Sequence, residues 1–242
     1  MTIEQLRLQL RQLANPETSR LLQRYFKTGP GQYGAGDLFL GIKVPPLRNL
    51  ARQGCGIAHD EVQELLASEF HEERLLALLI WVGQYSRHPE RRQQIVADYL
   101  SNTKRVNNWD LVDLSAPGLV GNWLVERGEA AIDLETLARS DWLWDRRIAV
   151  LATLALIRVG SFQATLRLTR LLMHDGHDLM HKACGWMLRE LGKRSPELLR
   201  EFLNAEVEQM PRTMLRYAIE RFPEPERRSW LSRPSSRIRR SP

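Results

Sequence analysis

Apolar residues recur along almost the whole chain at the three- and four-residue spacing of amphipathic α-helices. The first such stripe consists of Ile3, Leu6, Leu10 and Leu13, and it ends at Asn15-Pro16. No segment shows the alternation of apolar and polar positions that predicts a β-strand. The pattern therefore predicts an all-α protein without a β-sheet.

Similar stripes predict helices over most of the remaining chain, and proline marks several of their starts. A second stripe, with Leu21 and Tyr25 among its members, ends at Phe26. Further helices are expected at residues 44–51, 59–66, 72–84, 89–100, 119–125, 134–138, 142–159, 162–173, 178–191, 196–203 and 211–222, with a short last helix near Trp230.

Three of these helices resemble one another in sequence. Residues 71–87, 143–160 and 179–194 each carry a basic residue near their start and continue into an apolar run. Aligning them pairs Arg74 with Arg147 and Lys182. Arg147 lies 73 residues after Arg74, about two repeat units, and Lys182 lies 35 residues after Arg147, about one repeat unit. Periods of this size indicate an α-solenoid, a superhelix of HEAT-like helical repeats.

This organisation predicts one domain with a concave surface, because equivalent positions of successive inner helices line the same side of a solenoid. We expect the repeat domain to cover residues 1–231. Residues 232–242, SRPSSRIRRSP, are expected to form a basic, disordered tail.

The stretch NNWDLVD at residues 107–113 is read as a short helix. Trp109 and Asp113 lie four residues apart and therefore on one face. Asp110 is rotated by about 100° from the indole and is expected to brace the helix or its neighbours. An indole beside a carboxylate suits a substrate with a flat or positively charged group, and the alternative is a half-buried Trp with a helix-end Asp. The residues expected to anchor the turn in a core are Leu111, Val112 and Leu114.

The repeat alignment predicts a basic groove that contains two indoles and one carboxylate. Arg and Lys contact phosphates, and indoles pack on sugars or bases, so this composition favours binding of a DNA backbone. Arg212 begins a further helix in a similar way. The other residues expected in the groove are Arg74, Trp109, Asp113, Arg147, Lys182 and Trp186.

Composition agrees with an anionic partner. The 242 residues carry a formal net charge of +6 with a pI near 9.7, which suggests nucleic acid. Cys55 and Cys184 form no CxxC motif, so both are expected to be reduced thiols of a cytosolic protein. The N-terminus lacks the apolar core of a secretory signal, and the longest uncharged apolar run, 148–157, is too short for a bilayer. We expect no membrane association.

Three further patterns have simple interpretations. The glycine-rich segment at residues 28–43 looks like a phosphate cradle, but it lacks the GK[ST] of a P-loop and is better explained as a connecting loop. His177 and His181 could share a metal, but no HExxH motif is present and we expect no metal or cofactor. Glu72-Glu73 is expected to complement a helix dipole.

Four motifs resemble those of the AlkD-type DNA alkylation repair glycosylases, a family built from HEAT-like repeats. They are FLGIKVPPLRNLAR at 39–52, NWDLVD at 108–113, WDRRIAVL at 144–151 and KACGWMLRELGK at 182–193. The resemblance extends from Tyr25 to about Arg221.

The resemblance implies roles for individual residues. Trp109, Asp113 and Trp186 would lie at the active cleft and form the catalytic set. Arg146 beside Arg147 leaves open which of the two enters the groove. The residues expected to bind DNA are Tyr25, Arg74, Arg147, Lys182 and Arg212.

The resemblance also implies a reaction. The enzyme would hydrolyse the N-glycosidic bond of cationic N3- or N7-alkylated purines in duplex DNA, without flipping the base into a deep pocket. A monomer that acts in the cytoplasm, on the nucleoid when bound to DNA, is expected. Two alternatives stay open: a non-catalytic HEAT-repeat module that binds DNA or a protein, and an RNA-binding α-repeat protein, which would need repeated polar pairs.

Overall fold

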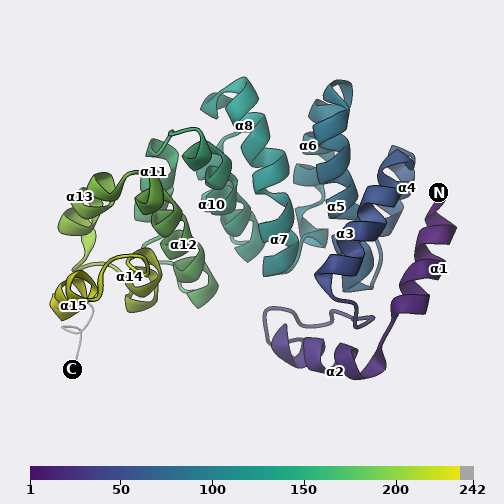
Figure 1. Cartoon of the computed structure of the whole chain (residues 1–242), viewed down its shortest axis with the longest axis horizontal. Coiled ribbons are helices and arrows are strands. Elements are labelled where there is room, and N and C mark those ends of the chain that lie inside the picture. Colours follow the sequence, from purple (N-terminus) through teal and green to yellow (C-terminus); the bar gives the residue numbers. More distant parts are fainter. Residues whose placement is uncertain (235–242) are drawn as a thin grey trace. The chain divides into compact units, whose positions relative to one another are not determined.

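The computed structural model describes residues 1–234. Within this range every regular element is a helix, and the one β-type feature is an isolated bridge between Leu38 and Phe70 (Figure 1). The predicted all-α helical repeat fold without a sheet is therefore confirmed. None of the described helices is both long and apolar enough to span a membrane.

Contacts between residues divide the chain into two compact units, Met1–Leu119 and a second that begins at Val120. The prediction of a single domain over residues 1–231 stays a prediction. The helices of the first unit are α1 (Ile3–Leu13), α2 (Pro16–Tyr25), α3 (Val44–Gln53), α4 (His59–Leu66), α5 (His71–Arg87), α6 (Arg92–Ser101) and α7 (Trp109–Ser115).

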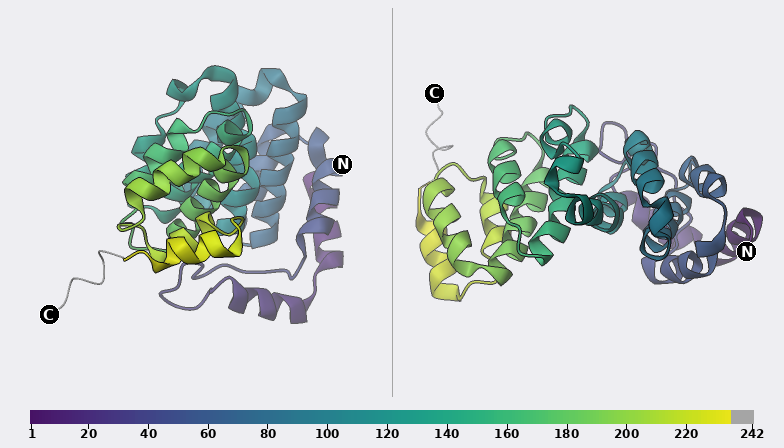
Figure 2. Two further views of the ribbon diagram at one scale, coloured as in Figure 1. Left: turned by 60° about the vertical axis from the view of Figure 1, so that its left-hand side comes forward. Right: turned by 90° about the horizontal axis from the view of Figure 1, so that it is seen from above.

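The second unit contains the remaining helices, and a π-helical turn at Pro117–Gly121 lies at the boundary between the units. The helices of the second unit are α8 (Asn122–Arg127), α9 (Leu134–Ala138), α10 (Leu143–Arg158), α11 (Gln163–Leu171), α12 (Asp178–Arg194), α13 (Pro196–Glu206), α14 (Arg212–Ala218) and α15 (Glu224–Ser232). Helices α12 and α14 lie side by side (Figure 2). A Cβ at Gly185 would come within 2.5 Å of the Met214 carbonyl oxygen, so only glycine permits this approach.

The start of α5 connects several segments of the first unit. Its first four residues, His71 to Arg74, are polar and all buried. Glu73 binds Arg7 at 3.3 Å and Arg11 at 2.9 Å, both on α1. A buried charge must be paired or hydrogen-bonded to be tolerated, so these residues are held by partners far along the chain. The expectation that Glu73 complements the helix dipole did not include these partners on α1.

Glu72 holds the glycine-rich loop. Its carboxylate accepts hydrogen bonds from the backbone N–H groups of Leu40, Gly41 and Ile42 at 2.8, 2.8 and 3.1 Å. Gly41 has a φ of +85°, and a Cβ there would lie 2.1 Å from the Asn15 carbonyl oxygen. These three N–H groups bind an anion that belongs to the protein itself, which supports the connecting-loop interpretation.

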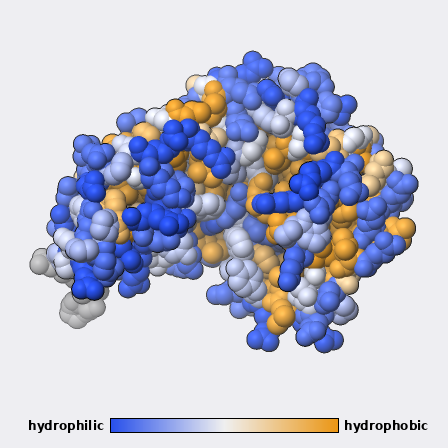
Figure 3. Space-filling model, viewed as in Figure 1, coloured by the Kyte–Doolittle hydropathy of each residue, from blue (hydrophilic) through white to orange (hydrophobic). Residues whose placement is uncertain are grey.

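Helix α2 differs from the prediction of a core stripe. Asn15 caps its start and Pro16 occupies its first turn, yet the helix contains no buried residue. Leu21 is 57% exposed and Tyr25 65%. Phe26, directly after the helix, is the buried member of the stripe. Apolar side chains therefore reach the surface of the first unit (Figure 3).

The structure corrects the repeat alignment by one residue. Arg74 Nη1 donates to the carbonyl oxygens six and five residues before it, those of Ser68 and Glu69, at 3.0 Å each. Arg146 Nη1 makes the same two bonds, to Ser140 at 2.8 Å and Asp141 at 3.0 Å. Arg74 therefore corresponds to Arg146 and not to Arg147.

The third helix follows the corrected register. His181 Nε2 bonds to the carbonyl oxygen of Asp175, again six residues earlier. His181 is thus the counterpart of Arg146, while Arg147 and Lys182 remain equivalent to each other. The equivalent residues Arg74, Arg146 and His181 each bind the turn before their helix. The predicted pairing of Arg74 with Arg147 was therefore wrong.

Two smaller predictions can be compared with the structure. Cys55 and Cys184 are both buried and free, as expected for reduced thiols, and burial raises the pKa of Cys184 to about 12. Ser232 belongs to α15, and Arg233 lies over the Trp230 ring at 4.2 Å, so the helical domain extends into the predicted tail. The rest of that tail, residues 235–242, lies outside the described residues.

Candidate active site

Helix α7 presents Trp109 and Asp113 from one face, as predicted. Asn108 caps the helix, its Oδ1 accepting from the Trp109 N–H at 2.9 Å. Leu111 and Val112 are completely buried, whereas Trp109 and Asp113 are only half-buried. Leu114, expected in the core, is also half-buried. The indole and the carboxylate therefore stand one turn apart on a helix that is anchored from behind.

Aromatic rings surround the indole. Trp109 stacks on Phe26, with centroids 5.2 Å apart and planes at 15°. Tyr25 meets Trp109 edge-on at 6.0 Å and is 65% exposed. The structure thus brings the predicted cleft residue Tyr25 beside Trp109. Such π-systems can pack against a sugar or base and attract positive charge.

A buried polar network lies beneath these rings. Asp37 of the glycine-rich loop is 5% exposed and is its centre. Its Oδ1 accepts from Arg74 Nη2 at 2.6 Å and from Asn107 Nδ2 at 3.1 Å. Its Oδ2 lies 3.1 Å from both His71 Nδ1 and Asn108 Nδ2. The network joins the loop, the start of α5 and the start of α7.

His71 completes this network on the side of α7. Its Nε2 lies 2.8 Å from Asp110 Oδ2, and Asp110 Oδ1 accepts from the Leu111 N–H at 2.9 Å. Burial opposes a charge on His71, but Asp110 and Asp37 outweigh it and raise the pKa of His71 to about 9. Burial also acts against the Asp37 carboxylate, yet His71 and Arg74 lower its pKa. Asp110 therefore braces its own helix, and that prediction is confirmed.

Arg74 was expected to bind DNA, and its placement contradicts this. The side chain is 4% exposed, and its guanidinium donates to Asp37 and to two backbone carbonyl oxygens. Moving it to a phosphate would remove one of the two charge partners of the buried Asp37, which is costly. Arg74 is a structural brace of the first unit.

The second unit carries the other predicted site residues. Trp186 is half-buried and its Nε1 donates to Glu190 Oε1 at 3.1 Å. Lys193 Nζ binds the same carboxylate at 2.7 Å. Burial opposes this charge, but Lys193 and Trp186 lower the pKa of Glu190. Lys182 binds Asp178 at 2.8 Å and keeps 40% of its side chain exposed. The Trp186 ring is thus oriented by an ion pair.

The three remaining arginines have distinct contacts. Arg146 Nε binds Asp175 at 2.7 Å, which together with its carbonyl bonds makes it a brace. Arg147 Nη1 donates to the Leu179 carbonyl oxygen at 2.8 Å, and Arg212 Nη2 to that of Arg233 at 2.6 Å. Arg147 is 5% exposed, about as buried as Arg74, so the structure does not favour it over Arg146 as the arginine that enters the groove. DNA contacts by Arg147 and Arg212 stay predictions.

Comparison with known proteins identifies the family. A family model described as DNA alkylation repair enzyme matches residues 6–222. The chain belongs to this family. A solved structure described as "Predicted DNA alkylation repair enzyme from Enterococcus faecalis" covers 87% of this chain and 97% of its own, with a TM-score of 0.69 and 18% identity. That likeness shows the fold, and no curated relative matches.

Two histidines of this DNA alkylation repair enzyme, His177 and His181, form local hydrogen bonds at the start of α12. His177 Nδ1 accepts from the Leu179 N–H at 3.2 Å and so caps α12, while His181 binds the Asp175 carbonyl oxygen. Within residues 1–234 no group of three or more His, Cys, Asp or Glu side chains is placed to hold a metal ion.

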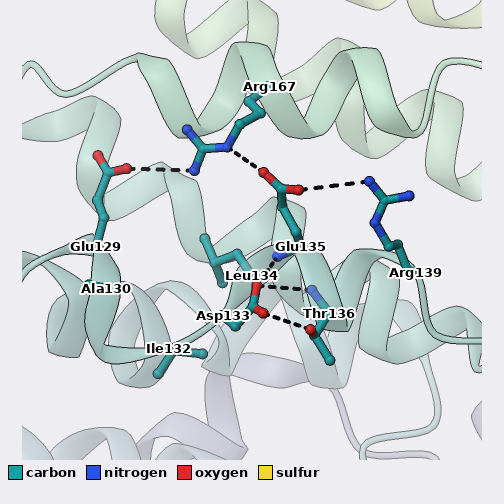
Figure 4. Close-up of a pocket in the computed structure, with 9 residues that line it drawn as sticks. All are labelled: Glu129, Ala130, Ile132, Asp133, Leu134, Glu135, Thr136, Arg139 and Arg167. Atoms are coloured by element: carbon teal, nitrogen blue, oxygen red, sulfur yellow. Dashed lines mark hydrogen bonds and ion pairs between the residues drawn. The ribbon is translucent and has the colours of Figure 1, made fainter.

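Two pockets in the second unit of the repair enzyme are lined by residues other than the predicted catalytic ones. One of them has Arg167 between Glu129 and Glu135, at 3.9 and 2.8 Å, while Glu135 also pairs with Arg139 (Figure 4). Both of its arginines are therefore already paired with carboxylates. Another is lined by residues of α12, α13 and α14, with Arg200 bound to Glu226.

Sequence reasoning missed the residues that support Trp109, namely Phe26, Asp37 and His71. The four polar residues from His71 to Arg74 resemble the solvated start of a helix. Asp37 lies in the glycine-rich segment, whose glycines were sufficient to predict a connecting loop, so its carboxylate gave no separate signal. The one available signal was Phe26, which follows the predicted cleft residue Tyr25 directly.

Proposed function

We propose that this repair enzyme is a DNA glycosylase that hydrolyses the N-glycosidic bond of cationic N3- or N7-alkylated purines in duplex DNA. The observation that carries the proposal is the partly exposed aromatic surface of Trp109 and Tyr25, with Asp113 one helical turn from the indole. This surface lies on a buried polar scaffold and belongs to a chain of the DNA alkylation repair family.

The chemistry requires few groups. A purine alkylated at N3 or N7 is already cationic, so it leaves as a neutral base without a strong general acid. The enzyme must then stabilise an oxocarbenium-like sugar and supply water. Asp113 performs both tasks, through its charge and as a general base. The carboxylate pair of most sugar hydrolases is therefore unnecessary.

The aromatic and basic residues hold the nucleotide. Trp109 and Trp186 present π-faces that favour the positive charge developing on the deoxyribose. Tyr25 adds a further ring, and Lys182 and Arg212 contact phosphates. Recognition through the backbone, without base flipping, follows from this assignment. That the enzyme is a cytoplasmic monomer is a further prediction.

Incubation with methylated duplex DNA tests the function. The enzyme is mixed with DNA treated with a methylating agent, and the supernatant is chromatographed for free purines. Release of N3-methyladenine and N7-methylguanine above the rate without enzyme is expected, with none from unmethylated duplex. Binding to the methylated duplex without release would leave the non-catalytic HEAT-repeat module as the better interpretation.

A further inference from the structure

His71 lies between two carboxylates that come from distant parts of the first unit. Its Nδ1 is 3.1 Å from Asp37 Oδ2, and its Nε2 is 2.8 Å from Asp110 Oδ2. Ionised carboxylates only accept hydrogen bonds, and a neutral imidazole has one N–H group. Both contacts are satisfied at once only when the ring carries two protons.

The other groups around the His71 ring do not compete with Asp37 and Asp110 for its two nitrogen atoms. Phe26 and Phe39 contact it with centroids 5.1 and 4.4 Å away, so apart from Asp37 the loop and the end of α2 face it with uncharged rings. On α5 itself, Arg74 is directed to Asp37, while Glu72 and Glu73 are directed to the loop backbone and to α1. The His71 side chain is nearly inaccessible, its residue being 1% exposed.

The same groups reach the candidate site. Asp110 follows Trp109 directly in α7, and Phe26 contacts both the His71 ring and the Trp109 indole. Asn108, which caps α7, binds the same Asp37 oxygen as His71. His71 is therefore connected to Trp109 through Asp110, through Phe26 and through the Asp37–Asn108 contact.

We propose that His71, held as an imidazolium between Asp37 and Asp110, is a positioning residue that fixes Trp109 and Asp113 in their working orientation. This inference rests on the glycosylase function proposed above. When His71 loses a proton, one of its two contacts places lone pair against lone pair in a dry site, and the start of α7 shifts away from Phe26. Base excision then declines at alkaline pH.

The first test is the pH profile of excision under single-turnover conditions with saturating enzyme. N3-methyladenine duplex is used from pH 7 to 10, and the rate without enzyme is subtracted. The wild-type rate is expected to fall about tenfold or more with a midpoint near the His71 pKa of about 9. His71→Gln is expected to lower the rate at pH 7.5 on the order of 10- to 100-fold and to abolish this pH step.

His59→Gln is the matched control. His59 also pairs with an aspartate, Asp98, and also stacks on an aromatic ring, that of Trp81, but these residues do not contact Trp109. It should keep the wild-type rate and its pH step. A wild-type rate that is flat to pH 10, or a step that persists in His71→Gln, would overturn the positioning role. The wild-type titration decides this even if His71→Gln does not fold.

The second test does not depend on excision. The enzyme is labelled with 5-fluorotryptophan, and the Trp109 ¹⁹F resonance is assigned from the spectrum of Trp109→Phe. This resonance should shift with a midpoint near pH 9 in the wild type and stay constant in His71→Gln. A shift without any base release would mean that the glycosylase proposal fails while the positioning role holds. Base release with no shift up to pH 10 would mean the reverse.

Discussion

At the scale of single residues, Asp113 carries the largest share of the proposed chemistry. It lies one turn after Trp109 on a helix whose opposite side is buried. Asp113→Asn keeps the shape of the side chain and removes its charge. The variant should fold and bind duplex DNA but excise alkylated purines roughly 100-fold more slowly, because positioned charges and general bases contribute about this much. Single-turnover rates measure the effect.

Two carboxylates of the first unit serve as comparisons for Asp113→Asn. Asp60 is exposed near the start of α4, and Asp60→Asn should leave excision unchanged. Asp110→Asn removes the partner of His71 and should lower the melting temperature. Equal excision by wild type and Asp113→Asn would remove Asp113 from the mechanism.

The two tryptophans of the proposed site should affect excision more than general DNA affinity. Trp109→Ala and Trp186→Ala remove π-faces assigned to the lesion sugar, whereas phosphate contacts dominate binding to undamaged duplex. We expect the excision rate to fall at least tenfold more than the affinity for undamaged duplex. This difference corresponds to the loss of one stacking contact, which contributes about 1–3 kcal/mol. Fluorescence anisotropy with undamaged duplex and single-turnover excision give the two quantities.

Trp123→Ala is the matched control for these variants. Trp123 is also partly exposed and lies under the Arg127 guanidinium, 5.0 Å away. It should retain wild-type excision. A thermal melt accompanies each variant, and unfolding of Trp109→Ala or Trp186→Ala at the assay temperature would assign that indole to the core and not to the substrate.

At the scale of secondary-structure elements, the start of α5 joins α1, the glycine-rich loop and α7. Glu72→Gln tests the loop contact, since the amide has one acceptor oxygen where the carboxylate uses two. We expect a loss of about 1–3 kcal/mol in the free energy of unfolding, the usual consequence of leaving buried groups unsatisfied. Urea unfolding measures it. Glu69→Gln, an exposed neighbour, should change the midpoint little, and a similar loss there would contradict the specific role of Glu72.

Helix positions were largely predictable because most helices bury a stripe of their own residues, α2 being an exception. The start of α3 at Val44-Pro45 and of α4 at His59 agree with the expected starts. The partners of the α5 start were not predictable, since Glu72 and His71 bind groups 30 to 39 residues away and sequence spacing gives no such pairing. A local pattern shows which residues share a face, but not which distant loop contacts them.

The repeat register shows the same limit. Arg146 and Arg147 are adjacent and chemically identical, so alignment alone could not choose between them. The choice depends on carbonyl oxygens six and five residues earlier, which only the folded turn presents. For the candidate site, the Trp109–Asp113 face followed from helical spacing, while the neighbourhood of Tyr25 and Trp109 required the fold.

At the scale of the whole molecule, the net charge of +6 predicts salt-dependent DNA binding. Each neutralised phosphate contributes about one unit to the slope of log affinity against log salt concentration. Lys182→Ala should reduce this slope by about one without changing sequence preference. Arg158→Ala, which removes an exposed charge at the far end of α10, should not change it. An affinity independent of salt would contradict the phosphate contacts altogether.

Stability should also depend on pH, in a direction set by the buried network. The pKa of His71 is raised from 6.5 to about 9, so its contribution is complete below pH 6.5 and is lost as the pH rises through 9. The size is on the order of 3 kcal/mol, the free energy that such a shift represents. The lowered pKa of Asp37 acts oppositely, and its contribution is lost on acidification below 3.8. Calorimetry of the first unfolding transition from pH 6 to 10 should show a decline for the wild type and for His59→Gln, but a smaller one for His71→Gln. A transition temperature that stays constant over this range in the wild type would mean that His71 is not charged in the folded protein.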